Sequence, residues 1–117
     1  MLEAGLYSAI APLILLLVSS VWQYPPILEE LVKWLILRTG GRGWIVGLVF
    51  GLSEAILFSL NAWSSGQWGV MGMRLLLTVP MHALTGAVIG WGMKNGLGWL
   101  GLFLAIVIHA GFNYGVR

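Results

Sequence analysis

The residues that could carry chemistry in this chain are a few acids, two histidines and one amide, all set in otherwise apolar stretches. They are Glu29, Glu30, Glu54, His82, His109 and Asn113. A carboxylate assisted by a histidine can take a proton from water as a general base. A second histidine and an amide can donate hydrogen bonds to the oxyanion that forms when water attacks a peptide carbonyl. This set could therefore support peptide hydrolysis, which would need no serine, threonine or cysteine nucleophile.

The composition predicts that these residues lie in a lipid bilayer. Hydrophobic residues make up 59% of the 117 residues and charged residues only 9%, whereas a soluble domain carries about 25% charged residues. So few charges cannot cover a water-facing surface. We expect one integral membrane domain over residues 1–117, and the scattered basic residues give no stripe that would bind nucleic acid.

Turn signals divide the chain into stretches that fit an all-α, polytopic transmembrane bundle. A membrane-spanning helix needs about 20 largely apolar residues, and Gly-, Pro- and Asn-rich segments break the apolar pattern. The predicted helices cover about 5–22, 27–38, 44–63, 70–93 and 97–116. The helix at 27–38 is short, and the first is read as a retained span rather than a signal peptide.

Glycines at four-residue spacing predict where these helices touch. Gly47 and Gly51 form such a pair in the third helix, and Gly86 and Gly90 form one in the fourth. In a bilayer, small residues at this spacing allow two helix backbones to approach closely. We therefore expect the third and fourth helices to pack through these faces.

Basic residues at the helix ends give the orientation. Arg38, Arg42 and Lys94 fall on one side of the bilayer if the helices alternate, and Arg74 and Arg117 fall on the other. Cytoplasmic loops carry the excess of Lys and Arg. The pattern predicts a cytosolic N-terminus, in a prokaryotic cell membrane.

The same alternation brings the polar residues of four helices to one depth. A charged side chain inside a bilayer costs about 2.5–3.5 kcal/mol on insertion scales, so such residues face the bundle interior by default. At 1.5 Å per residue, the glutamates and histidines all lie roughly 5–15 Å below one surface. Glu29 and Lys33 have the spacing of an ion pair, which would leave Glu30 to point elsewhere, and His109 and Asn113 share a helix face.

Four short motifs in this order resemble a known family. They are Glu29-Glu30-x-x-Lys33, Gly47-x3-Gly51-x-x-Glu54, Arg74-x5-Pro80-x-His82 and His109-x3-Asn113. The set resembles the PrsW-type glutamic intramembrane proteases, which belong to a wider group with the CAAX prenyl proteases and bacteriocin-processing enzymes. The motifs span residues 29–113 and fall on four predicted helices.

The resemblance implies a role for each residue. Glu29 or Glu30 would activate the water, and His82 would orient it. The oxyanion would be held by His109 and Asn113, while Lys33 would form a structural ion pair. Glu54 would be a further family glutamate. The substrate would be a membrane protein or a membrane-associated peptide, and no cofactor would be needed.

Three other functions fit the same residues. His82, His109 and Glu54 could hold Zn²⁺ with a bound water, as in a metallopeptidase. Buried acids and histidines at one depth could also form the proton or cation relay of a transporter component. The small chain with glycine-rich faces could instead be a non-catalytic subunit or inactive protease relative, in a homo-oligomer or a larger membrane complex.

Overall fold

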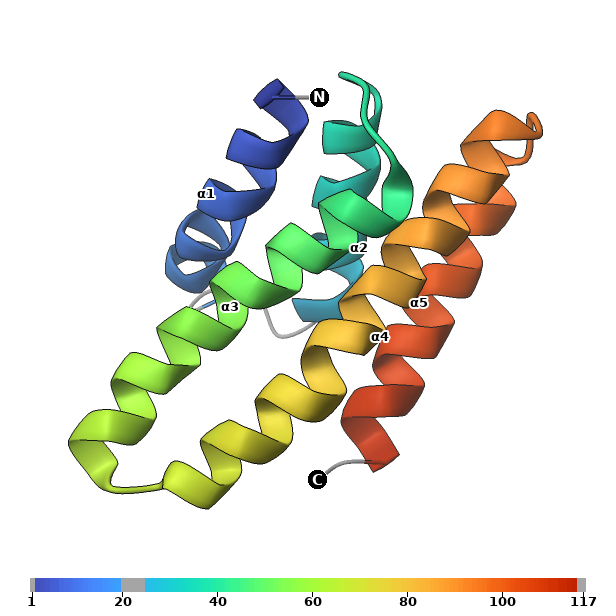
Figure 1. The fold of residues 1–117 in the computed structure, drawn as a ribbon. Helices are drawn as coiled ribbons and strands as arrows, with labels where there is room; N and C mark the ends of the chain where they lie inside the picture. The colour runs from blue at the N-terminus through green and yellow to red at the C-terminus, as the bar shows by residue number, and fades with distance from the viewer. Residues whose placement is uncertain (1, 20–24, 116–117) are drawn as a thin grey trace.

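The computed structural model describes residues 2–19 and 25–115. In these ranges the chain forms five α-helices and no strand (Figure 1). The helices are α1 (Leu2–Ser19), α2 (Pro25–Leu37), α3 (Gly43–Ser65), α4 (Trp68–Lys94) and α5 (Gly98–Gly115). The all-α prediction is confirmed, and each helix lies within a few residues of its expected range. The predicted ends of the first helix at 22 and the last at 116 lie outside the described residues.

Prolines and glycines set the boundaries of α2. The helix begins at Pro25 and Pro26, where a missing N–H does no harm because the first turn has no partner for it. After α2 ends, Gly40 and Gly41 adopt φ values of 120° and 95°. Residues with a side chain rarely adopt these angles. The chain can therefore reverse sharply from α2 into α3.

The backbones of α3 and α4 lie in direct contact through glycines. A Cβ added at Gly47 would collide with the His82 carbonyl oxygen, and one added at Gly86 would collide with the Gly43 carbonyl oxygen. Two of the predicted small residues thus form the contact between these helices. This close approach places the next turns of α3 and α4 side by side, and those turns carry Glu54 and His82.

The short helix α2 lies at the centre of the arrangement and contacts each of the other four helices. α4 packs between α3 and α5, while α1 lies against α2 and α3 (Figure 1). The buried apolar side chains include Ile36, Val46, Phe50, Ile89 and Leu102. Because α2 is enclosed on several sides, Glu30 and Lys33 on this helix are fully buried.

Among the residues that the structure describes, two helical stretches are long and apolar enough to cross a membrane, namely Leu75–Lys94 and Gly98–Gly115. Shorter apolar stretches lie at Leu2–Leu15 and Gly43–Leu57. The outer surface of the helices is also apolar, since Ile56, Leu76 and Phe103 are each more than half exposed. 

Candidate active site

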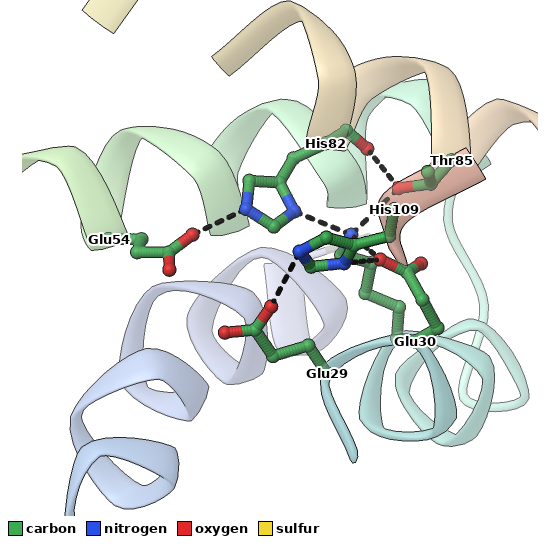
Figure 2. A network of polar contacts seen from close by, with 7 residues as sticks. Glu29, Glu30, Glu54, His82, Thr85 and His109 are labelled. Atoms are coloured by element: carbon green, nitrogen blue, oxygen red, sulfur yellow. Dashed lines mark hydrogen bonds and ion pairs between the residues drawn. The ribbon is translucent and has the colours of Figure 1, made fainter. Parts of the chain in front are cut away.

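Seven polar side chains from four helices meet in one buried cluster (Figure 2). They are Glu29, Glu30 and Lys33 of α2, Glu54 of α3, His82 and Thr85 of α4, and His109 of α5. We refer to these residues as the polar cluster. The structure thus brings together five of the six residues whose types and spacing indicated chemistry, although they are up to 80 positions apart, from Glu29 to His109.

Lys33 links α2 to α4 and uses all its donors. Its Nζ lies 2.8 Å from Glu30 Oε1, 2.7 Å from His82 Nδ1 and 2.8 Å from Thr85 Oγ1. An ammonium group has three N–H donors and no acceptor. Each donor therefore has one partner, and the fully buried charge of Lys33 is compensated on all sides.

The expected pairing of Lys33 with Glu29 is wrong, because Lys33 pairs with Glu30. Both spacings bring side chains together on a helix, so burial decides between them. Glu30 is fully buried, whereas the Glu29 side chain is 13% exposed. A buried carboxylate without a cation costs far more than one at the edge, and Glu29 instead turns toward His109 on α5.

The contacts of His82 fix where its ring proton lies. Since Lys33 can only donate, His82 Nδ1 must accept. The proton of a neutral ring is then on Nε2, which donates to Glu54 Oε2. Thr85 accepts from Lys33 and donates to the His82 backbone carbonyl at 3.2 Å. His82 is therefore a neutral donor whose orientation is held from both ends.

His109 lies between two carboxylates. Its Nδ1 is 2.6 Å from Glu30 Oε1, and its Nε2 is 3.1 Å from Glu29 Oε2. Because the Glu30 carboxylate accepts from both Lys33 and His109, His109 Nδ1 donates to it and Nε2 faces Glu29. The ring stands edge-on to His82, with centroids 5.0 Å apart and an interplanar angle of 88°.

Glu29, His82 and His109 surround one small space. One ligand atom from each residue lies within 4.8 Å of the other two. Within this group, Glu29 Oε2 and His109 Nε2 are 3.1 Å apart, so they already share a hydrogen bond. A water molecule beside Glu29 could contact its carboxylate, whereas both ring nitrogens of His82 already have partners. The partial exposure of Glu29 and Glu54 marks this as the accessible edge of the polar cluster.

The fit of a metal ion to these residues is restricted by Lys33. The sequence suggested His82, His109 and Glu54 as Zn²⁺ ligands, whereas the structure groups Glu29 with the two histidines. Zn²⁺ binds a histidine nitrogen at about 2.0–2.1 Å. One nitrogen of His82 already faces the Lys33 ammonium, and the other contacts Glu54. His82 could become a ligand only after losing one of these partners.

Asn113 is the one predicted site residue that lies apart. It is exposed one turn beyond His109, and no hydrogen bond joins it to the polar cluster, all of which lies in the described part of the chain. Two residues outside the predicted set contact the cluster instead. Thr85 shares a face with His82 at three-residue spacing, and the Phe50 ring lies 5.2 Å from the His82 ring and 5.0 Å from Lys33 Nζ.

Comparisons with protein-family models, curated proteins and solved structures give no match to this chain. The molecule is an all-α protein in which four helices enclose a cluster of three glutamates, two histidines, a lysine and a threonine. The chemistry of that cluster is the basis for the function considered next.

Proposed function

We propose that this chain is an integral membrane peptidase that hydrolyses a peptide bond of a membrane-associated substrate, with Glu29 as the general base. The observation that carries the proposal is the convergence of Glu29, His82 and His109, whose ligand atoms lie within 4.8 Å of one another at the partly exposed edge of the polar cluster. A glutamate at such an edge can take a proton from water. The resemblance to PrsW-type proteases supports the same chemistry.

The two neighbouring glutamates differ in how available they are. Glu30 Oε1 already accepts hydrogen bonds from Lys33 and His109, and the Glu30 side chain is fully buried. Its carboxylate holds Lys33 and His109 in place. Glu29 contacts His109 and lies beside Glu54, and it remains partly exposed. A base must reach both water and substrate, so we assign this role to Glu29 and a positioning role to Glu30.

The reaction balances with groups that belong to the chain. Glu29 takes a proton from water while the water oxygen attacks the peptide carbonyl carbon. The resulting oxyanion accepts hydrogen bonds from His109 and from Asn113, whose exposed amide is free to meet a substrate. The C–N bond then breaks, and the proton held by Glu29 passes to the leaving amine. His82 is held by Lys33 and Glu54, and it orients the water when its Nε2–H turns from Glu54 to the water oxygen.

The location of the polar cluster favours a substrate in the membrane. The candidate spans Leu75–Lys94 and Gly98–Gly115 carry His82 and His109 in their interior. Ionisable groups inside membrane spans mark functional sites. The polytopic bundle, the cytosolic N-terminus and the prokaryotic membrane belong to this proposal.

A zinc-dependent peptidase is the second candidate, because the same three ligand atoms are close enough to converge on a metal ion. Lys33 argues against it, since a cation 2.7 Å from His82 Nδ1 repels Zn²⁺. The bound metal would supply an activated water and a Lewis acid. Glu29, His82 and His109 would hold it, and the role of general base would pass to another carboxylate.

The test is cleavage of single-span membrane peptides by the purified protein in liposomes, with and without a chelator. We expect cleavage that survives chelation and is lost in His82→Ala and His109→Ala. Loss on chelation with rescue by zinc would favour the metal-dependent enzyme. If the folded wild type cleaves no peptide of the library, the peptidase proposal fails, and proton flux in the same liposomes or co-purifying partners would then favour the transporter or the subunit.

A further inference from the structure

A second polar region lies at the opposite end of α2, outside the polar cluster. A cleft of about 480 Å³ opens between the end of α2, the end of α4 and the start of α5. We call it the Trp–Arg cleft, and its lining consists of Trp34, Arg38, Met93, Gly96, Gly98 and Trp99. Its volume is within the range of small-molecule sites, about 300–1,000 Å³.

The cleft has apolar walls and one fixed cation. The Trp34 and Trp99 rings lie 5.9 Å apart at centroid distance, and the Arg38 guanidinium stacks over the Trp34 ring at 5.2 Å. Gly96 and Gly98 have no side chains, so they contribute backbone to the lining of the cleft. A guanidinium stacked on an indole is held in place while its N–H donors stay free for a ligand.

The charge of Arg38 has no acidic partner. The chain has four acidic residues, all in the described ranges, and none forms an ion pair with Arg38. Three of them lie in the polar cluster, and Glu3 is on α1, which does not line the cleft. The cation is therefore available to an anion from outside the chain, and the indoles favour a ligand with an apolar part.

The position of the cleft indicates which ligand combines an anionic group with an apolar part. It lies at the ends of the candidate spans Leu75–Lys94 and Gly98–Gly115. In a bilayer this is the level of the lipid phosphates, where tryptophans gather. Basic pockets between membrane helices bind anionic lipid headgroups. Exposed apolar side chains such as Leu100 and Phe103 continue from the cleft along α5 and would contact an acyl chain.

We propose that the Trp–Arg cleft binds an anionic phospholipid, with the phosphate on Arg38 and the glycerol and upper acyl chain against the adjoining rings of Trp34 and Trp99. The proposal rests on membrane insertion but not on peptidase activity. The protein would bind this lipid even if it cleaves nothing, so failure of either proposal leaves the other testable.

The test is native mass spectrometry of the full chain in a mild detergent with phosphatidylglycerol or phosphatidylcholine. We expect the wild type to retain phosphatidylglycerol about fivefold or more over phosphatidylcholine, the size expected for one cation near an anionic headgroup. Arg38→Gln should abolish the preference. Arg42→Gln is the matched control, because Arg42 is an exposed cation on the same side that does not line the cleft, and it should keep the preference.

A second variant tests the contribution of the Trp99 ring to lipid binding. Trp99 is 79% exposed, so Trp99→Ala should fold as the wild type does and yet retain less phosphatidylglycerol. Equal retention of both lipids by the wild type, or equal losses in Arg38→Gln and Arg42→Gln, would overturn the proposal. So would displacement of phosphatidylglycerol by glycerol 3-phosphate at equal concentration, which would identify a site for a soluble phosphate ester.

Discussion

The polar cluster and the Trp–Arg cleft differ in how their charges are paired. In the polar cluster, Lys33 and the two glutamates of α2 have hydrogen-bond and ion-pair partners within α2 and on α4 and α5. In the Trp–Arg cleft, Arg38 finds only an aromatic ring. The first region is completed by the chain itself and is buried. The second is exposed and is completed by a molecule from outside.

This difference predicts how each region responds to substitution. Removing one member of a buried, paired set leaves another charge uncompensated, which costs several kcal/mol. Removing an exposed cation without an acidic partner costs the fold little. Substitutions of the fully buried residues of the polar cluster should therefore change stability and activity together, whereas substitutions at exposed or partly exposed positions should change only binding or turnover.

The largest effect on stability is expected for Lys33→Met. The change leaves the fully buried Glu30 without its cation, and breaking a buried pair in this way costs about 3–5 kcal/mol. Unfolding of the purified protein by SDS titration in mixed micelles would measure the loss. Glu30→Gln combined with Lys33→Met should recover part of it, since both charges are then absent.

Lys94→Met is the matched control for this measurement. Lys94 is exposed at the end of α4, and its loss should leave the unfolding midpoint within about 0.5 kcal/mol of the wild type. A Lys33→Met protein as stable as Lys94→Met would contradict the account of Lys33 as the central cation.

Asn113→Ala should separate turnover from stability. The exposed side chain makes no hydrogen bond to the polar cluster, so stability should change by less than about 0.5 kcal/mol. Loss of one oxyanion donor lowers turnover by about 10²–10³-fold in enzymes of this kind. Cleavage rates and unfolding of the same preparation would show the split, and an unchanged cleavage rate would remove Asn113 from the proposed site.

Gly47→Ala should destabilise the contact that places α3 against α4. The new methyl group would meet the His82 carbonyl oxygen and carbon, and such overpacking costs about 1–3 kcal/mol. Gly72→Ala is the control, because a Cβ there has no neighbour within 4 Å. If the two alanine variants unfold alike, the glycine contact does not determine the position of His82.

A smaller effect on stability than those of Lys33→Met and Gly47→Ala is expected for Arg38→Gln. The loss of a stacking contact at an exposed site is worth about 0.5–1 kcal/mol. The same variant should lose its preference for phosphatidylglycerol. Arg38→Gln should thus change lipid binding with little change in stability, just as Asn113→Ala should change turnover with little change in stability. A loss of stability as large as that of Lys33→Met would mean that the two regions do not differ in the way described.

The fold and part of the site follow from local sequence signals. Prolines, glycines and apolar runs indicate the five helices, and the depth argument predicts that glutamates and histidines from four of them gather. Local sequence signals do not predict which residues of the polar cluster pair with each other. Glu29 and Glu30 are both within reach of Lys33 on one helix, and only their burial against α4 and α5 selects Glu30.

The hydrogen bonds between helices could not be predicted from the sequence either. His82 is held by Lys33 and Glu54, which come from two other helices, and their approach depends on the rotation of each helix about its axis. Thr85 was visible only as a neighbour of His82 on one helix face. The i,i+4 spacing correctly places Asn113 one turn from His109 on α5. The spacing does not show that this end of α5 is exposed, so Asn113 lies apart from the polar cluster.

The most direct test of the account is to compare Glu29→Gln with the wild type in the liposome cleavage assay, after SDS titration has shown that both proteins are folded. Glu29 is partly exposed, so the substitution should leave the fold intact and remove the base. The account predicts that cleavage falls below detection while the unfolding midpoint stays near that of the wild type. Cleavage by Glu29→Gln at the wild-type rate would contradict it.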